Sequence, residues 1–543
     1  MKVRTPVSAL LLVCAATLTL AGGPAAGRPA SAAEPPVIRE APAPPAFTDA
    51  ERQAELRARR GRVAAKLGPN SVLVLLSAEP RVYTNDVDYE FRQENNLYYL
   101  TALRQKGANL VMFVGDGGAT REILFLPRRN PAAETWTGHM YSPEEAQRVS
   151  GVGEIWEARE FEPFMSAVRS RLAYRPAPGS LLLSPPNPPA APPESFAAAA
   201  AKNGAALYLL LEPGGEESRE YERERAYAVA WGAGAPAGLS VRSAWEVLAE
   251  LRMRKSPYEL RLLQHAVDIS IEGHQRAQAV APRSRWEYEV EAELDYTYKR
   301  RNADNWGYPS IVGCGPNATT LHYEESQGPV RPGDLLLMDA AAEYEHYSAD
   351  VTRTFPVSGR FTREQAEVYN VVLAAQEAAF RAIRPGAQLS DVHNAATEVI
   401  KDGLLRLGLV TEKNSLQFRT WFMHGTSHYI GMNVHDVSVR GAKLDVGMTF
   451  TVEPGIYVRP DALDNLPKTP ENEKFIAAVR PAFEKYRGIG VRIEDDVIVT
   501  ADGYRNLSAA LPRSVQEIEA FIARAQKEVR VGLLPWRRGA AGE

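Results

Sequence analysis

The stretch Leu337–Pro356 reads LMDAAAEYEHYSADVTRTFP and places acidic side chains inside an otherwise apolar pattern. Asp339 comes directly after four large apolar residues, and Asp350 follows eleven residues later. The segments Leu335–Ala342 and Tyr347–Pro356 have the composition of strands, and two such strands can pair as a hairpin. Because a lone buried charge is costly, each aspartate indicates a strand end in water, a salt bridge or a shared site.

Two later segments, Met448–Val458 and Gly490–Thr500, carry acids in the same way, at Glu453 and Glu494. Taken singly, each acid is explained by a strand end in water or an ion pair. Taken together, and with a histidine cluster in the same half of the chain, they favour one shared site. Four carboxylates carry four negative charges, which two divalent cations would cancel. An oxygen-rich set with one imidazole suits Mn²⁺, Co²⁺ or Zn²⁺ bound as a close pair.

The histidine cluster lies in Phe422–Asp436, FMHGTSHYIGMNVHD, which holds His424, His428 and His435. The first two have the i, i+4 spacing of the zinc-protease motif H-E-x-x-H, but Gly425 stands where that motif needs its glutamate. A second glycine and two β-favouring residues also argue against a continuous helix. In a strand, His424 and His428 would still face the same way. The residues alone leave open which histidine is a ligand.

Length and composition limit the class of protein. A chain of 543 residues is too long for one ordinary core, so two or more domains are expected. Its 45% hydrophobic and 24% charged residues are typical of a soluble globular protein. The net charge of −4 leaves no basic surplus to neutralise a phosphate backbone, so we expect no nucleic-acid partner.

The N-terminus has the features of an export signal. Met1–Arg4 is positively charged, Val7–Leu20 is an apolar run, and Ala30–Ala32 fits an A-x-A cleavage site. The run is short for a membrane span, so we predict a cleaved signal peptide over 1–33 rather than an uncleaved anchor. The mature protein would then be periplasmic or secreted, without a stable membrane span. Residues 34–48 are rich in Pro and Ala and predict a flexible or extended leader.

Beyond the leader the chain divides near residue 240. Residues 49–240 alternate short apolar runs with amphipathic stretches, which predicts a mixed α/β domain. Residues 241–530 form the second predicted domain, and its first helix should begin at a capping box formed by Ser256 and Glu259. The expected strands of the first domain are Val72–Leu76, Leu110–Val114, Ile123–Leu126, Leu181–Leu183 and Leu207–Leu211. The expected further helices of the second are Trp286–Arg301, Thr362–Ile383 and Ser390–Leu407.

Taken in their order along the chain, the motifs resemble those of the proline-specific metallopeptidases of the pita-bread fold, the Xaa-Pro aminopeptidases (aminopeptidase P) and prolidases. The matching segments are Ile311–Tyr323, Leu337–Pro356, Phe422–Asp436, Thr451–Tyr457 and Arg487–Val497. Phe91–Leu103 (FRQENNLYYLTAL) is similar to the N-terminal domain found with these enzymes. The resemblance implies an α+β protein, with a C-terminal pita-bread catalytic domain after a mixed α/β N-terminal domain.

The resemblance also implies roles for individual residues. Two divalent metal ions would be expected, Mn²⁺ first, with Zn²⁺ or Co²⁺ as alternatives. Their ligands would be Asp339, Asp350, His428, Glu453 and Glu494. Glu453 would also act as general base and acid, and His322 and His435 would stabilise the intermediate and leaving group. The residues that would contact substrate or support the ligands are His424, Tyr457 and Arg492.

The implied reaction is metal-assisted hydrolysis of the N-terminal Xaa-Pro bond in peptides with proline second, by a homo-oligomer (dimer or tetramer). Prolidase, which cleaves Xaa-Pro dipeptides, is the alternative. Ser427 before the ligand histidine favours the aminopeptidase, whereas the long segment Asp461–Tyr486 favours prolidase. A binding module of this fold that has lost its metals, or a creatinase-like enzyme, would have replaced ligands, and none is replaced. The additional N-terminal domain argues against methionine aminopeptidase.

Overall fold

The computed structural model describes residues 37–531, apart from 187, 189, 203, 213–220 and 233–237. The predicted signal peptide, 1–33, and residues 34–36 of the predicted leader lie outside the described residues. No helix in the described part of the chain is both long and apolar enough to cross a membrane.

The first sheet has seven strands in the order β7-β6-β5-β4-β1-β8-β9, with parallel and antiparallel neighbours. These strands are β1 (Ser71–Leu75), β4 (Asn109–Val114), β5 (Thr120–Leu126), β6 (Ile155–Glu157), β7 (Leu181–Leu183), β8 (Ala205–Leu209) and β9 (Leu239–Ser243). Side chains along β1 alternate between two cores, Leu73 and Leu75 in one, Val72 and Val74 in the other. Burial on both faces explains why β1 is a continuous apolar run.

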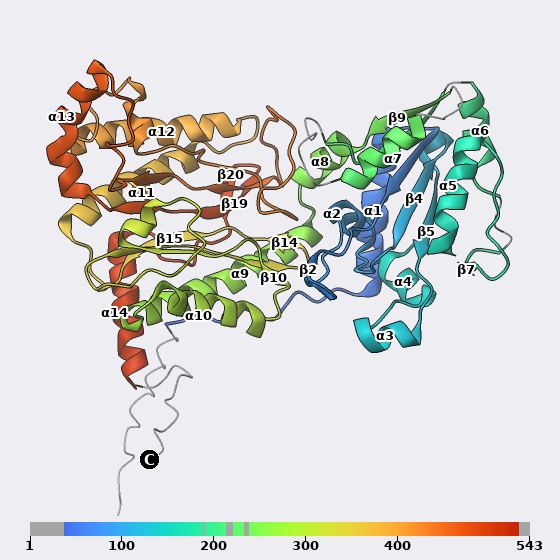
Figure 1. The fold of residues 1–543 in the computed structure, drawn as a ribbon, viewed down its shortest axis with the longest axis horizontal. Coiled ribbons are helices and arrows are strands. Elements are labelled where there is room, and N and C mark those ends of the chain that lie inside the picture. Colours follow the sequence, from blue (N-terminus) through green and yellow to red (C-terminus); the bar gives the residue numbers. More distant parts are fainter. Residues whose placement is uncertain are drawn as a thin grey trace, which may run out of the picture. The chain divides into compact units, whose positions relative to one another are not determined.

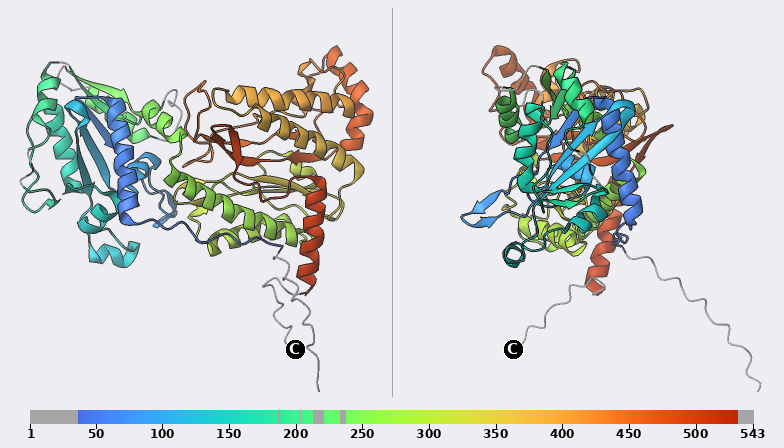
Figure 2. Two further views of the ribbon diagram at one scale, coloured as in Figure 1. Left: turned by 180° about the vertical axis from the view of Figure 1, so that it is seen from behind. Right: turned by 90° about the vertical axis from the view of Figure 1, so that its right-hand side faces the viewer.

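Helices cover both faces of this sheet (Figure 1). Val63 of α1 (Asp49–Leu67) lies in one core, and Phe164 of α5 (Phe161–Ser170) lies in the other. The other helices of this part are α2 (Asn95–Thr101), α3 (Pro131–Thr137), α4 (Pro143–Ser150), α6 (Glu194–Ala201), α7 (Glu222–Gly232) and α8 (Trp245–Met253). A separate hairpin of β2 (Val82–Thr84) and β3 (Val87–Asp88) projects away from the sheet (Figure 2).

Residues 37–47, within the predicted leader, run extended beside α9 (Pro257–Val280) and are called the N-terminal strap below. The backbone N–H of Ala41 donates to the buried carboxylate of Glu272 at 2.8 Å, and Phe47 stacks on Tyr258 with ring centroids 3.8 Å apart. Its buried apolar side chains are Val37, Ile38 and Ala41. The predicted leader is therefore extended here, and packing holds it in place.

Two sets of elements, each a helix pair followed by antiparallel strands, form most of the remaining chain. The first set comprises α9, α10 (Glu287–Arg300), β11 (Ile311–Cys314), β12 (Leu335–Asp339) and β15 (Thr352–Pro356). The second comprises α11 (Arg363–Ala382), α12 (Leu389–Leu407), β16 (Thr449–Val452), β17 (Gly455–Tyr457), β18 (Gly490–Arg492), β19 (Asp495–Thr500) and β20 (Gly503–Asn506). Figure 1 shows α9 and α10 on one side of the strands and α11 and α12 on the other.

The helices of these sets confirm the sequence-based expectations closely. Ser256 and Glu259 form the predicted capping box at the start of α9: Glu259 N donates to Ser256 Oγ at 3.2 Å, and Ser256 N donates to Glu259 Oε2 at 2.9 Å. A further helix, α13 (Pro470–Tyr486), lies between β17 and β18, inside the long segment Asp461–Tyr486. Another, α14 (Val515–Val531), follows β20. Short strands β10 (Asn305–Trp306), β13 (Ala342–Tyr344) and β14 (Tyr347–Ser348) form a sheet of their own.

The predicted continuous strands are interrupted, and the interruptions fall at the acidic residues. The hairpin predicted from the first two segments is present, since β12 pairs with β15 and Asp339 lies opposite Thr352. Asp339 ends β12, whereas Asp350 lies between β14 and β15. Glu453 separates β16 from β17, and Glu494 separates β18 from β19. All four acids line one cavity, described below.

Candidate metal centre and active site

A cavity of about 410 Å³ opens between the two helix-and-strand sets. Its lining includes all five predicted metal ligands: Asp339, Asp350, His428, Glu453 and Glu494. It also includes the other predicted site residues except one: His322, His424, His435 and Arg492. The exception is Tyr457, which is fully buried behind the cavity wall and contacts two of its residues.

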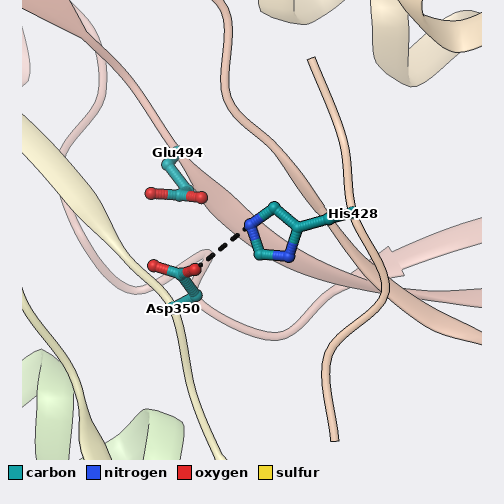
Figure 3. Close-up of side chains that lie close together, drawn as sticks. All are labelled: Asp350, His428 and Glu494. Atoms are coloured by element: carbon teal, nitrogen blue, oxygen red, sulfur yellow. Dashed lines mark ion pairs between the residues drawn. The ribbon is translucent and has the colours of Figure 1, made fainter. Parts of the chain in front are cut away.

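The ligand atoms of Asp350, His428 and Glu494 all lie within 4.8 Å of one another, so these three side chains could share one ion. Figure 3 shows them facing a common point from three separate segments. Nε2 of His428 lies 3.3 Å from Oδ2 of Asp350 and 3.4 Å from Oε1 of Glu453. One imidazole nitrogen therefore faces two of the predicted carboxylate ligands at once.

Asp339, the remaining carboxylate, is held from its other side. The Tyr308 hydroxyl donates to Oδ1 of Asp339, and a guanidinium nitrogen of Arg492 donates to Oδ2. Arg492 Nε also donates to the hydroxyl of Thr352 at 3.2 Å, and that hydroxyl donates to Glu494 at 2.6 Å. Arg492 thus contacts Asp339 directly and is linked to the expected ligand Glu494 through the hydroxyl group of Thr352.

Burial and mutual repulsion raise the pKa values of three carboxyl groups in the cluster. Burial raises the pKa of Glu453 to about 7, and the charges of Asp350 and Asp339 act in the same direction. The pKa of Asp350 is raised by burial, and that of Glu494 lies well above its usual range because burial adds to the charge of Asp350. Burial lowers the pKa of His428, but the hydrogen bond to Asp350 and the charge of Glu453 outweigh it and raise that pKa to about 9.

The three clustered histidines have different surroundings. His424 directs Nδ1 to the carbonyl oxygen of Gly425 at 2.7 Å and Nε2 to the Tyr457 hydroxyl at 2.8 Å, and Nδ1 also lies 3.6 Å from Oε2 of Glu453. Burial, with the charge of Arg492, lowers the pKa of His424 to about 4. His435 packs edge-on against His428, with ring centroids 4.3 Å apart. Of the three, only His428 belongs to the three-residue group that could hold an ion.

His322 lies exposed at the cavity wall, whereas Asp339, Asp350 and Glu494 are buried. The segment 424–431 contains no helix, as Gly425 and Gly431 predicted. Backbone bonds fix it beside β16: Glu453 N donates to Thr426 O at 2.8 Å, and Thr451 N donates to His428 O at 2.9 Å. These bonds place His428 beside Glu453.

Three residues near the ligands were not predicted as site residues: Tyr308, Thr352 and Asp496. Asp496 Oδ2 accepts a hydrogen bond from the Asp350 backbone N–H at 3.0 Å, while its buried Oδ1 has no hydrogen-bond partner among the described residues. The quoted segment Arg487–Val497 contained a signal for Asp496, because it shows two aspartates directly after Glu494 in an apolar run. Tyr308 and Thr352 gave no such signal, since uncharged hydroxyl groups are common in strands and turns.

The cluster has the donor set that a divalent metal centre needs. Four carboxylates and one imidazole converge, and Arg492 is the only other cationic side chain among the described residues that line the cavity. The negative charge of such a buried group is not balanced by one guanidinium and one imidazolium. Two divalent cations would balance it, and carboxylate with imidazole suits first-row divalent metals. The residues therefore fit a metal pair.

Two protein-family models match the chain. The first, described as metallopeptidase family M24, covers residues 261–501, and the second, aminopeptidase P, N-terminal domain, covers residues 56–173. Xaa-Pro aminopeptidase of Haemophilus influenzae is 33% identical over 479 residues, which are 86% of this chain and 96% of that protein. The chain belongs to the Xaa-Pro aminopeptidases of family M24.

Other Xaa-Pro aminopeptidases agree with this placement. The Escherichia coli enzyme is 32% identical over 486 residues, covering 87% of this chain and 98% of that protein. Among solved structures, E. coli aminopeptidase P with the inhibitor Pro-Leu superposes with a TM-score of 0.70 at 30% identity, covering 88% of this chain and 99% of that one. Zn-substituted E. coli aminopeptidase P in complex with product also has a TM-score of 0.70, at 30% identity.

These similarities confirm the fold predicted from the motifs, a pita-bread catalytic domain with a separate N-terminal domain. The chain is a metallopeptidase, and its relatives carry the name Xaa-Pro aminopeptidase, which favours the main functional prediction over prolidase. The boundary near residue 240 stays a prediction. The helix α13 forms the C-terminal part of the long segment Asp461–Tyr486, which had pointed towards prolidase.

Proposed function

We propose that this Xaa-Pro aminopeptidase removes the first residue from peptides with proline second, using two divalent metal ions. The observation that carries the proposal is the convergence of four carboxylates and His428 in one cavity of a family M24 chain. The residues that would hold the ions are Asp339, Asp350, His428, Glu453 and Glu494. Mn²⁺ is the first candidate, with Zn²⁺ and Co²⁺ as alternatives.

Bound divalent ions would supply Lewis acidity, polarising the carbonyl before proline and lowering the pKa of water. The chain's own residues handle protons and position groups. Glu453 lines the cavity and can accept the proton of the attacking water, then return it to the departing proline nitrogen. His322 and His435 line the same cavity and can donate hydrogen bonds to the carbonyl oxygen as negative charge develops on it.

The choice of the Xaa-Pro bond has a chemical reason. Proline carries no backbone N–H when its nitrogen is bonded to a preceding residue, and its ring fixes the backbone. A peptidase that recognises its substrate by a strand-like backbone contact at that position would lose a hydrogen bond. A cavity shaped for the ring, with apolar residues such as Ile311 and Leu321 in its wall, has no such requirement.

The proposal is tested by comparing two substrates with the metal-loaded chain. We expect an Xaa-Pro-Yaa tripeptide, or a longer peptide, to release its first residue, and an Xaa-Pro dipeptide to react far more slowly. Free amino acid and shortened peptide would be measured by mass spectrometry. Cleavage of dipeptides only would change the assignment to prolidase. Cleavage of neither, with two ions bound per chain, would refute the proposal.

Export and assembly remain predictions alongside this function. A signal peptide over 1–33 predicts a mature N-terminus near Ala33 and a periplasmic or secreted enzyme. N-terminal sequencing of the protein recovered from its source cells would test cleavage, and the intact terminus would contradict it. Light scattering would test the predicted dimer or tetramer against a monomer.

A further inference from the structure

The segment after the ligand His428, residues 429–436, forms an irregular loop that carries His435 and is called the histidine loop below. It contains no helix and no extended strand, apart from one bridge residue, Tyr429. Such a loop has little local structure to fix the position of a side chain. The contacts that hold it therefore determine where His435 lies.

Three of those contacts come from two residues of Phe91–Leu103, the motif that matches the aminopeptidase P N-terminal domain and that the reaction itself does not use. Arg92 Nη2 donates to the Met432 carbonyl oxygen at 2.8 Å. Asn95 Nδ2 donates to the same oxygen at 3.2 Å and to Oδ1 of Asn433 at 2.7 Å. Residues more than three hundred positions away in sequence thus hold the middle of the loop.

Asn95 and Arg92 are themselves fixed in place. Arg92 forms a bidentate ion pair with Glu343, with bonds of 3.0 and 2.7 Å, and donates to Asn95 Oδ1 at 2.8 Å. That oxygen also lies 3.2 Å from Nδ1 of His346. Because Asn95 Oδ1 is occupied by these partners, its amide nitrogen is oriented towards the histidine loop.

The end of the loop is anchored separately, by buried charges. Arg252 and Lys255 both pair with Asp436, and all three side chains are at most 1% exposed. Arg252 also donates to Asn433 Oδ1 at 2.8 Å and to Asn96 Oδ1 at 2.9 Å. Asn433 Oδ1 therefore accepts from Asn95 and from Arg252 at once. His435 lies between these two anchor points.

We propose that Arg92 and Asn95 are positioning residues for His435, through the histidine loop. The inference rests on the proposed function, in which His435 contacts the reacting carbonyl. The N-terminal domain then contributes to turnover, although none of its residues lines the cavity among the described residues. A displacement of about 1 Å at a catalytic group can cost about a hundredfold in rate, so the loss of either residue should reach the chemistry.

The first test compares Asn95→Ala and Arg92→Ala with a matched control, Arg104→Ala. Arg104 pairs with Asp304 at 2.7 Å, as Arg92 pairs with Glu343, and both arginine side chains are 41% exposed. Among the residues that the structure describes, Arg104 forms no hydrogen bond or ion pair with the histidine loop. We expect kcat to fall about tenfold or more in the first two variants, with KM changing less and metal content unchanged. Arg104→Ala should keep kcat within about twofold of wild type.

The second test places Asn95→Ala in a His435→Ala background. If Asn95 acts through His435, its removal should then cost less than about twofold, because the two effects are coupled. Thermal midpoints of all variants would separate loss of folding from loss of positioning, and Arg92→Lys offers a second variant that keeps the charge. Undiminished kcat in Asn95→Ala and Arg92→Ala, an equal loss in Arg104→Ala, or full additivity with His435→Ala would overturn the inference. Failure of the wild type to cleave would instead count against the proposed function.

Discussion

His428 and His424 lie four residues apart in one irregular segment, yet their ring nitrogens have different partners. Nε2 of His428 faces Asp350 and Glu453, at 3.3 and 3.4 Å. Nε2 of His424 lies 2.8 Å from the Tyr457 hydroxyl, which also accepts from Arg492 at 2.9 Å. Nε2 of His428 therefore faces two carboxylates, whereas Nε2 of His424 is bonded to a hydroxyl group that Arg492 also contacts.

This difference predicts the metal content of two matched variants. His428→Ala should retain less divalent metal after dialysis than wild type, because it removes the only nitrogen ligand of the proposed pair. His424→Ala removes the same group from the same segment and should keep most of the metal. Elemental analysis per chain measures both. Equal metal content in the two variants would contradict the assignment of His428 as the ligand.

At this scale the sequence identified the charged residues and missed the neutral ones. Asp339, Asp350, Glu453 and Glu494 stand out because a charge in an apolar strand needs a reason. Tyr308 lies in a segment whose sequence is typical of a loop, and nothing in its neighbours indicates that its hydroxyl group would donate to Asp339. Among the three clustered histidines, residue spacing alone could not select His428, because the choice depends on acids far away in the chain.

At the scale of elements, the long helices were predictable and the strand ends were not. The capping box at Ser256 and the amphipathic pattern that follows it fix α9 from local sequence alone. The interruptions of the strands at Glu453 and Glu494 depend on contacts with residues in other segments of the chain, which local sequence does not show. Pro454 was a local signal for the first break, since it has no N–H for a strand partner. No proline marks the second.

Replacing two glycines of Phe422–Asp436 by alanine should affect the stability of the fold differently. A Cβ added at Gly431 would lie 2.2 Å from Asp436 Oδ2 and 2.7 Å from Lys255 Nζ, inside the buried anchor of the histidine loop. We expect Gly431→Ala to destabilise the fold by about 1–3 kcal/mol, because the ion pair must move. At Gly425 the same Cβ meets nothing within 4 Å. The thermal midpoints of Gly431→Ala and Gly425→Ala would be compared with that of the wild type. Equal decreases in the two variants would contradict the steric explanation.

At the scale of the whole molecule, the N-terminal strap joins the beginning of the described chain to its end. Val37 N donates to Glu528 of α14 at 3.1 Å, and Ala41 N donates to Glu272 of α9 at 2.8 Å. The strap therefore covers part of the catalytic domain's helices, although it precedes the N-terminal domain in sequence. The proline-rich composition suggested an extended chain, but its buried partners lie hundreds of residues away and could not be inferred locally.

Removal of the strap should lower stability more than removal of the residues before it. A chain that begins at residue 48 loses the burial of Val37 and Ile38 and leaves Glu272 without the Ala41 N–H, at a cost of about 2 kcal/mol or more. A chain that begins at residue 37 is the control. Thermal midpoints of the two chains measure the difference. Identical midpoints would show that the strap contributes nothing to the fold.

Metal removal should also be visible in the stability of the whole chain. Without divalent cations the buried carboxylates repel one another, so a chelator should lower the thermal midpoint. Added Mn²⁺ should restore it in a concentration-dependent way, since an ion that binds only the folded chain stabilises it by mass action. The His428→Ala variant should respond less to both treatments. A wild-type thermal midpoint that chelator leaves unchanged would argue against bound ions.

The spacing of the ligands along the chain has a consequence for how the enzyme is made. Asp339 and Asp350 are synthesised long before Glu494, the last carboxylate of the group, which lies near the C-terminal end. Arg92 and Asn95 are made earlier still and have no loop to hold until residues 431–436 follow. A chain that ends before residue 494 would lack one ligand of the proposed metal pair, so we expect such a truncated product to have no peptidase activity.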